Sequence, residues 1–174
     1  LIISRTLMFR VLLANLKSYP LIFSHSYKGT LRRFLCSRCG LLDQEIKMLS
    51  LNEVTFKQGL DTHVTLPNSE SSLMNLLKDN LEAIETFTRP TQELYLEYLA
   101  SMHVLDSDPI HLVDIGYSGT IQKALGILTG QRIIGHYMIT TQTAANTENN
   151  TFIGYLFSQQ QWGQGCSVLE HSLY

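Results

Sequence analysis

The chain has 174 residues, 44% of them hydrophobic, which is enough to bury the core of one domain without disulfide or metal support. Thirteen Lys and Arg residues against 15 Asp and Glu residues give a net charge of -2, which excludes a basic surface for non-specific nucleic-acid binding. Only 16% of the residues are charged, against about 25% in a typical soluble domain, so part of the surface is expected to face other protein.

The N-terminal region predicts a short buried strand over residues 1–4 and a helix over residues 7–16. Arg5 and Arg10 interrupt its apolar run, which is therefore far shorter than the ~20 residues of a membrane span. No signal peptide is expected, because no small-residue cleavage pattern follows.

Residues 30–36 mix β-branched, aromatic and basic side chains, and we interpret them as a second strand. The next segment has weaker patterns. A helix over residues 44–51 and a loop or short strand over residues 59–67 are the expectations there.

A helical insertion is predicted over about residues 70–104. Leucines at spacings of three and four favour a helix over residues 72–87. A break is expected at residues 88–90, with Pro90 in the first turn of a helix that runs to about residue 103.

The clearest pattern follows the insertion. It predicts a buried strand over residues 110–115, a tight loop over 116–119, a helix over 121–128, and strands over 132–140 and 152–157. Strands that alternate with helices indicate an α/β fold with a mainly parallel open sheet, of the Rossmann-like or phosphoribosyltransferase-like kind.

One strand–loop–helix junction contains the candidate ligand-binding residues. Asp114 ends the strand, and the loop Gly116, Tyr117, Ser118, Gly119 and Thr120 opens the helix. Loop amides and the helix N-terminus would bind phosphate oxygens there, with hydroxyl groups as further donors. Asp114 would accept from sugar hydroxyls or hold Mg²⁺ through water. The alternative is that Asp114 caps the loop and the glycines form a turn.

The segment from Asp114 to Thr120 resembles the phosphoribosyl-pyrophosphate loop of type I phosphoribosyltransferases. In that family a pair of acids ends the strand and a loop of small residues wraps the 5'-phosphate. Val113 stands here at the position of the first acid. The resemblance therefore implies phosphate binding more directly than it implies transferase activity.

The order of the predicted segments along the chain also resembles that in the C-terminal region of bacterial surface-polysaccharide biosynthesis proteins. These proteins carry a haloacid-dehalogenase-like hydrolase domain, a glycosyltransferase domain, or both. Residues 113–122 match their Val-Asp-Ile-Gly-Trp-Ser-Gly-Thr-Ile-Gln motif, with Tyr117 in place of Trp. Ser4-Arg5 and Ser37-Arg38 match parts of two further segments.

If these two segments also lie at carboxyl ends of strands, Arg5 and Arg38 would join the phosphate site, because a guanidinium can grip two phosphate oxygens. The alternative is that both arginines are solvated.

The two resemblances imply a reaction that is hydrolase-like or of the glycosyl- or phosphoribosyltransferase type. Whether this chain is itself an enzyme is left open.

No metal site is predicted. Cys36 and Cys39 have the spacing of a zinc or redox pair, but the chain lacks further ligands at suitable spacing. The histidines, including His136 in an apolar strand, are expected in the core or on the surface. Three cysteines favour a reducing, cytoplasmic compartment.

The sequence thus predicts a single α/β domain over residues 1–174 that binds a phosphorylated sugar or nucleotide. We expect it to be part of a longer chain with an upstream domain, because the sequence opens inside an apolar run and residues 168–174 read as a helix cut short. The alternative function is a catalytically degenerate docking or regulatory module for an upstream hydrolase or transferase domain.

Overall fold

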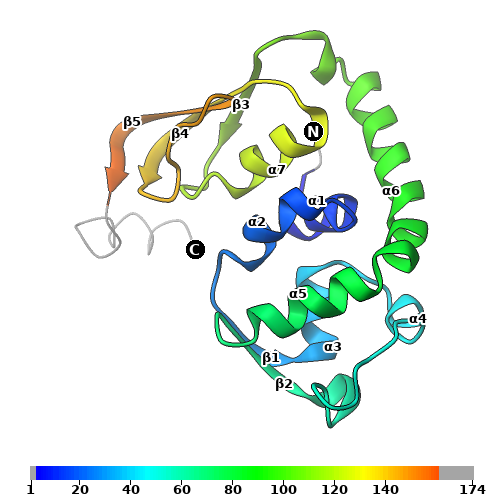
Figure 1. Cartoon of the computed structure of the whole chain (residues 1–174). Coiled ribbons are helices and arrows are strands. Elements are labelled where there is room, and N and C mark those ends of the chain that lie inside the picture. Colours follow the sequence, from blue (N-terminus) through cyan, green and yellow to red (C-terminus); the bar gives the residue numbers. More distant parts are fainter. Residues whose placement is uncertain (1–2, 161–174) are drawn as a thin grey trace. The chain divides into compact units, whose positions relative to one another are not determined.

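A computed structural model describes residues 3–160 of the chain. The chain divides into two compact units, Leu1–His103 and Val104–Tyr174, whose elements are labelled in Figure 1. The prediction of one α/β domain over residues 1–174 stays a prediction. The C-terminal helix expected at residues 168–174 lies outside the described residues.

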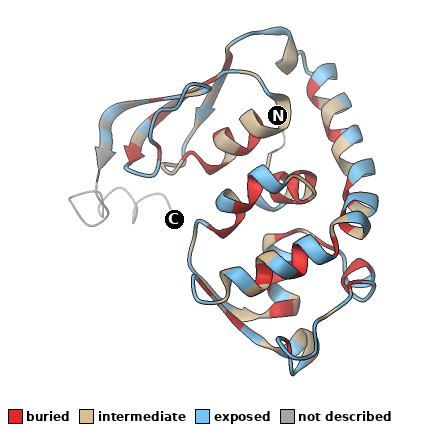
Figure 2. Ribbon diagram, viewed as in Figure 1, coloured by how far each residue is buried: buried red, intermediate tan, exposed pale blue. Residues whose placement is uncertain are grey.

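The first unit is mainly helical. Its elements are α1 (Arg5–Leu12), a 3-10 turn (Leu16–Ser18), α2 (Tyr19–Phe23), β1 (Tyr27–Thr30), α3 (Leu31–Arg33), a π-helical segment (Phe34–Arg38), α4 (Asp43–Ile46), a 3-10 turn (Gly59–Asp61), β2 (His63–Leu66), α5 (Glu70–Asp79) and α6 (Leu81–Ser101). β1 and β2 pair antiparallel, and the helices share one apolar core. Figure 2 shows the buried residues of α6 as red bands between exposed ones.

The N-terminal prediction of a strand over residues 1–4 is wrong at Ile3 and Ser4, which lie in no strand, and residues 1–2 lie outside the described part. Ser4 is the N-cap of α1, and its Oγ accepts a hydrogen bond from the N–H of Leu7 at 3.2 Å. Serine is a favoured cap because its short hydroxyl satisfies an amide that the first helical turn leaves free.

The strand predicted over residues 30–36 is also wrong, because the chain becomes helical directly after Thr30. Thr30 caps this helical stretch by accepting a hydrogen bond from the N–H of Arg33. Leu31, Phe34 and Leu35 are all fully buried, at the spacing of three and four residues that places them on one helical face. The spacing of the apolar residues therefore outweighs their β-propensity.

The break between the two long helices lies at Asn80 rather than before Pro90. The amide side chain of Asn80 exchanges hydrogen bonds with the backbone of Ser50, which fixes the turn between α5 and α6. Pro90 lies inside α6. The carbonyl of Phe87, in the turn that the proline interrupts, accepts a hydrogen bond from Arg10 at 3.1 Å.

Arg10 also forms an ion pair with Glu45, at 2.8 Å, in which both side chains are largely buried. Burial opposes ionisation of Glu45, but hydrogen bonds from Arg10 and from the N–H of Leu42 outweigh it and hold the pKa of the carboxyl below its usual value. The pair therefore stabilises the folded state only while Glu45 is ionised.

This contact predicts a pH dependence. Because the pKa of Glu45 is lower in the folded chain, its stabilisation is complete above the ordinary glutamate pKa of about 4.3 and is lost as the pH falls below it. The difference in free energy of unfolding between the wild type and Glu45→Gln should therefore shrink between pH 7 and pH 3. Urea unfolding at several pH values measures it, and a constant difference would contradict the role of the ionised carboxylate.

The second unit contains the predicted strand–loop–helix–strand pattern. Its elements are a 3-10 turn (Val104–Asp106), β3 (Ile110–Asp114), α7 (Thr120–Thr129), β4 (Ile133–Thr141) and β5 (Asn150–Gln160). The strands form a parallel sheet in the order β3-β4-β5, and α7 lies along one of its faces (Figure 1). A parallel sheet with a helix between strands is consistent with the predicted α/β class.

The two faces of this sheet differ. On the face that α7 covers, Tyr137 and Ile133 are 1% exposed. On the other face, Val113 is 82% exposed and Tyr155 67% exposed. We call this second surface the open face and define it by five side chains that the strand register places together: His111, Val113, His136, Met138 and Tyr155. Parallel sheets usually have both faces covered, so the open face is unusual.

Candidate functional site

The loop between β3 and α7 joins the carboxyl end of a strand to the N-terminus of a helix. β3 ends at Asp114, and Gly119 is the N-cap of α7 with φ +65°, in the left-handed region. A Cβ atom built on Gly119 would lie 2.2 Å from Cε1 of Phe152. Only glycine therefore fits this position, on grounds of both conformation and space.

Asp114 has the loop-capping contact that the alternative interpretation expects. Its Oδ1 accepts a hydrogen bond from the N–H of Gly116 at 2.8 Å, which closes a local turn. Among residues 3–160, no group donates a hydrogen bond to Oδ2. Half-buried at the strand end, Asp114 thus caps the loop with one oxygen and keeps the other available for a ligand.

Hydroxyl groups gather at the carboxyl ends of β3 and β4. The hydroxyls of Ser118 and Thr120 lie 3.0 Å apart, within one hydrogen bond. The carbonyl of Tyr117 accepts from both the N–H and the hydroxyl of Thr141, and that hydroxyl also lies 2.8 Å from the hydroxyl of Thr143. The loop is therefore tied to β4, and several donors surround the start of α7.

Lys123 adds a cation that the sequence analysis missed. It lies in the first turn and a half of α7, with its ammonium 5.6 Å from the centre of the Phe152 ring and donating to the carbonyl of Thr143. Burial lowers the pKa of Lys123, and no carboxylate of the described residues forms an ion pair with it. Because helical side chains point back toward the helix N-terminus, a lysine at this position could have been placed beside the loop from sequence.

Gln122 holds α7 onto the sheet. Its amide is fully buried, and Nε2 donates to the carbonyls of Ile133 and Thr151 at 3.1 and 2.9 Å. Its Oε1 accepts from the hydroxyl of Tyr137 at 2.9 Å. Gly135 leaves the space for this amide, since a Cβ there would lie 1.8 Å from Oε1. Gln122 therefore positions the helix whose N-terminus faces the loop.

Arg5 and Arg38 belong to the first unit, and neither follows a strand as expected. Arg38 lies in the π-helical segment and donates to the carbonyls of Ile22 and Ser26, with its guanidinium 5.7 Å from the Tyr27 ring. Its pKa is lowered first by burial and then by the charge of Arg5. Arg38 thus has a structural role, Arg5 is exposed in α1, and their participation in a phosphate site stays a prediction.

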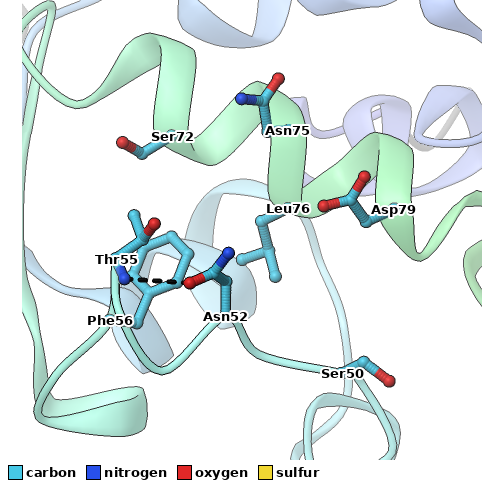
Figure 3. Close-up of a pocket in the computed structure, with 8 residues that line it drawn as sticks. All are labelled: Ser50, Asn52, Thr55, Phe56, Ser72, Asn75, Leu76 and Asp79. Atoms are coloured by element: carbon cyan, nitrogen blue, oxygen red, sulfur yellow. Dashed lines mark hydrogen bonds between the residues drawn. The ribbon is translucent and has the colours of Figure 1, made fainter.

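A small polar pocket of about 200 Å³ lies in the first unit, and none of the residues expected to bind phosphate lines it. Figure 3 shows Leu76 pointing from α5 toward Phe56 and Asn52, while Asn75 points to the other side of the helix. The Oδ1 atom of Asn52 already accepts from the N–H of Thr55 at 3.1 Å. Nothing in this pocket adds to the chemistry of the loop.

The cysteine pair predicted to have no metal or redox role is unpaired in the structure. Cys36 is exposed and Cys39 is buried, and burial raises the pKa of the Cys39 thiol to about 12. Among residues 3–160, no three His, Cys, Asp or Glu side chains are grouped to hold a metal ion. In the same part of the chain, none of the helices has both the length and the apolar character needed to cross a bilayer.

Comparison of the chain with protein-family models, with curated proteins and with solved structures finds no match. The resemblances to phosphoribosyltransferases and to polysaccharide biosynthesis proteins therefore rest on the motif residues from Val113 to Gln122.

Proposed function

We propose that the second unit binds a phosphorylated sugar or nucleotide at the loop between β3 and α7. The observation that carries the proposal is the junction itself. A glycine in the left-handed conformation opens a ten-residue helix at the carboxyl end of a parallel strand. In an open α/β sheet, ligands bind at this edge, and helix N-terminal amides favour anions.

Each loop residue has a role in this proposal. The backbone from Gly116 to Thr120 would contact phosphate oxygens, with the Ser118 and Thr120 hydroxyls as donors. Lys123 would provide the positive charge, since its burial without a carboxylate partner among residues 3–160 is relieved by an anion. The free Oδ2 of Asp114 would accept from a sugar hydroxyl or from water around Mg²⁺, which commonly keeps several waters and binds ligand phosphates.

The family context is part of the same proposal. A Rossmann-like or phosphoribosyltransferase-like unit in a hydrolase or glycosyltransferase of polysaccharide synthesis would hold the phosphorylated donor or product at such a loop. Arg5 and Arg38 are not required, because the loop has its own cation in Lys123 and the Arg38 guanidinium already donates to backbone carbonyls.

Isothermal titration with ribose 5-phosphate, phosphoribosyl pyrophosphate and a nucleotide sugar, each with Mg²⁺, tests the proposal. We expect at least one ligand to bind the wild type and Lys123→Met to weaken binding by roughly 10-fold or more, as expected for loss of a charged hydrogen bond. Asp114→Asn should also weaken binding, although its amide oxygen can keep the turn to Gly116.

Two exposed residues of the first unit provide matched controls. Lys78→Met and Asp79→Asn make the same chemical changes on α5 and should leave the affinity unchanged. Equal losses in the control variants, or binding that Lys123→Met leaves intact, would contradict a site at the loop.

The open face favours a second candidate function, that of a docking module for a hydrolase or transferase domain. None of the five side chains that define the face is Asp, Glu, Lys or Arg, and Val113 and Met138 are 82% and 52% exposed on it. A partner surface that is apolar and uncharged would fit it. A folded chain that binds none of the phosphate ligands would favour this alternative.

A further inference from the structure

Three aromatic side chains form a hydrogen-bonded row across the open face. His111 comes from β3, His136 from β4 and Tyr155 from β5. Nδ1 of His111 lies 2.9 Å from Nε2 of His136, and Nδ1 of His136 lies 2.7 Å from the hydroxyl of Tyr155. The planes of neighbouring rings are nearly parallel, with interplanar angles of 16° and 17°.

We propose that His111 Nδ1 and His136 Nε2 form a two-imidazole binding site for a divalent transition-metal ion. Imidazole nitrogen is a preferred ligand of Ni²⁺, Cu²⁺ and Zn²⁺. Both side chains lie on a surface that no described element of this unit covers, so an ion can reach them. Water would fill the other coordination positions, since no third ligand side chain is grouped with them among residues 3–160.

The separation of the two nitrogens is compatible with chelation of one ion. Two nitrogens each about 2.05 Å from one ion lie about 2.9 Å apart at a right angle and about 3.3 Å apart at the tetrahedral angle. The observed 2.9 Å fits the right angle, which is typical of Ni²⁺ and Cu²⁺. In the hydrogen bond the two nitrogens face each other, so each ring has to turn by about 45° to direct its lone pair at an ion that subtends a right angle.

Tyr155 provides the outer partner that metal-binding histidines usually have. With an ion on Nε2, the ring proton of His136 lies on Nδ1, where the oxygen of Tyr155 accepts it. Without an ion, either nitrogen of His136 can carry the ring proton in these two hydrogen bonds.

Titration of tag-free, EDTA-treated protein with NiCl₂, followed by calorimetry, tests this site. We expect one Ni²⁺ per chain, bound more tightly than Zn²⁺. His111→Asn and His136→Asn should each weaken binding by roughly 10-fold or more, and Tyr155→Phe by about 10-fold through loss of the outer contact. Nickel should also broaden the amide NMR signals of β3 and β4 before others.

His63→Asn is the matched control, because His63 is an exposed strand histidine of the first unit. It should leave the Ni²⁺ affinity unchanged. If His136→Asn fails to fold, the exposed His111 variant alone decides the question. Nickel binding of equal strength in the wild type and His111→Asn, or no binding by the wild type at millimolar Ni²⁺, would overturn the proposal.

Discussion

Replacement of Arg10 by alanine is expected to lower the free energy of unfolding of the first unit by about 3–5 kcal/mol, the usual cost of breaking a buried ion pair. Both carboxylate oxygens of Glu45 accept from the guanidinium at 2.8 Å. The same group donates to Thr91 Oγ1 and to the carbonyls of Gly40 and Phe87. One side chain therefore joins α1, α4, α6 and the segment before α4, and its removal leaves a buried carboxylate unpaired.

The pair of Arg89 and Glu85 provides the control for this prediction. It joins the same residue types at i,i+4 on α6, but its side chains are 60% and 49% exposed. Arg89→Ala should therefore change the free energy of unfolding by less than about 0.5 kcal/mol. Urea unfolding followed by circular dichroism measures both variants, and similar small effects would contradict the structural role of Arg10.

Replacement of Gln122 by leucine is expected to lower the free energy of unfolding of the second unit by about 3 kcal/mol or more, because several buried polar groups lose their hydrogen-bond partners at once. The carbonyls of Ile133 and Thr151 and the hydroxyl of Tyr137 would each lose the partner that the amide supplies. Leucine has nearly the same size as glutamine, so the loss of stability reports the lost hydrogen bonds rather than a cavity.

Gln142→Leu is the matched control for this change, since Gln142 is exposed in the segment after β4. Its effect should stay within about 0.5 kcal/mol. Amide hydrogen exchange of β4 and β5 should speed up in Gln122→Leu and remain unchanged in Gln142→Leu. Unchanged exchange in both variants would show that the amide does not hold α7 to the sheet.

The second unit could be predicted well because its signals are local. An apolar strand, two glycines in a loop and a glycine at the end of α7 each specify backbone geometry within a few residues, and Gly119 and Gly130 both adopt positive φ. The prediction that the strand over residues 110–115 is buried is wrong, because His111 and Val113 are exposed. The first unit depends on longer-range contacts. Pro90 lies inside α6 there, and Arg10, 77 residues before Phe87, bonds the Phe87 carbonyl in the same part of the helix. No local pattern contains that contact.

The same distinction applies to the candidate site. The loop from Gly116 to Thr120 was predictable, whereas the anchoring role of Gln122 depends on the space above Gly135. The row of His111, His136 and Tyr155 could not be predicted, because its members are 25 and 19 residues apart in sequence. Only the register of the three strands brings them together.

The most direct test of the phosphate-binding loop is a ¹⁵N–¹H NMR titration of the labelled chain with ribose 5-phosphate in the presence of Mg²⁺. We expect the largest chemical-shift changes at the amides of Gly116 to Gln122, with smaller changes at Thr141 and Thr143, and their loss in Lys123→Met. A saturating titration that leaves these amides unshifted, or that shifts residues of the small pocket of the first unit instead, would contradict a phosphate site at the carboxyl edge of the parallel sheet.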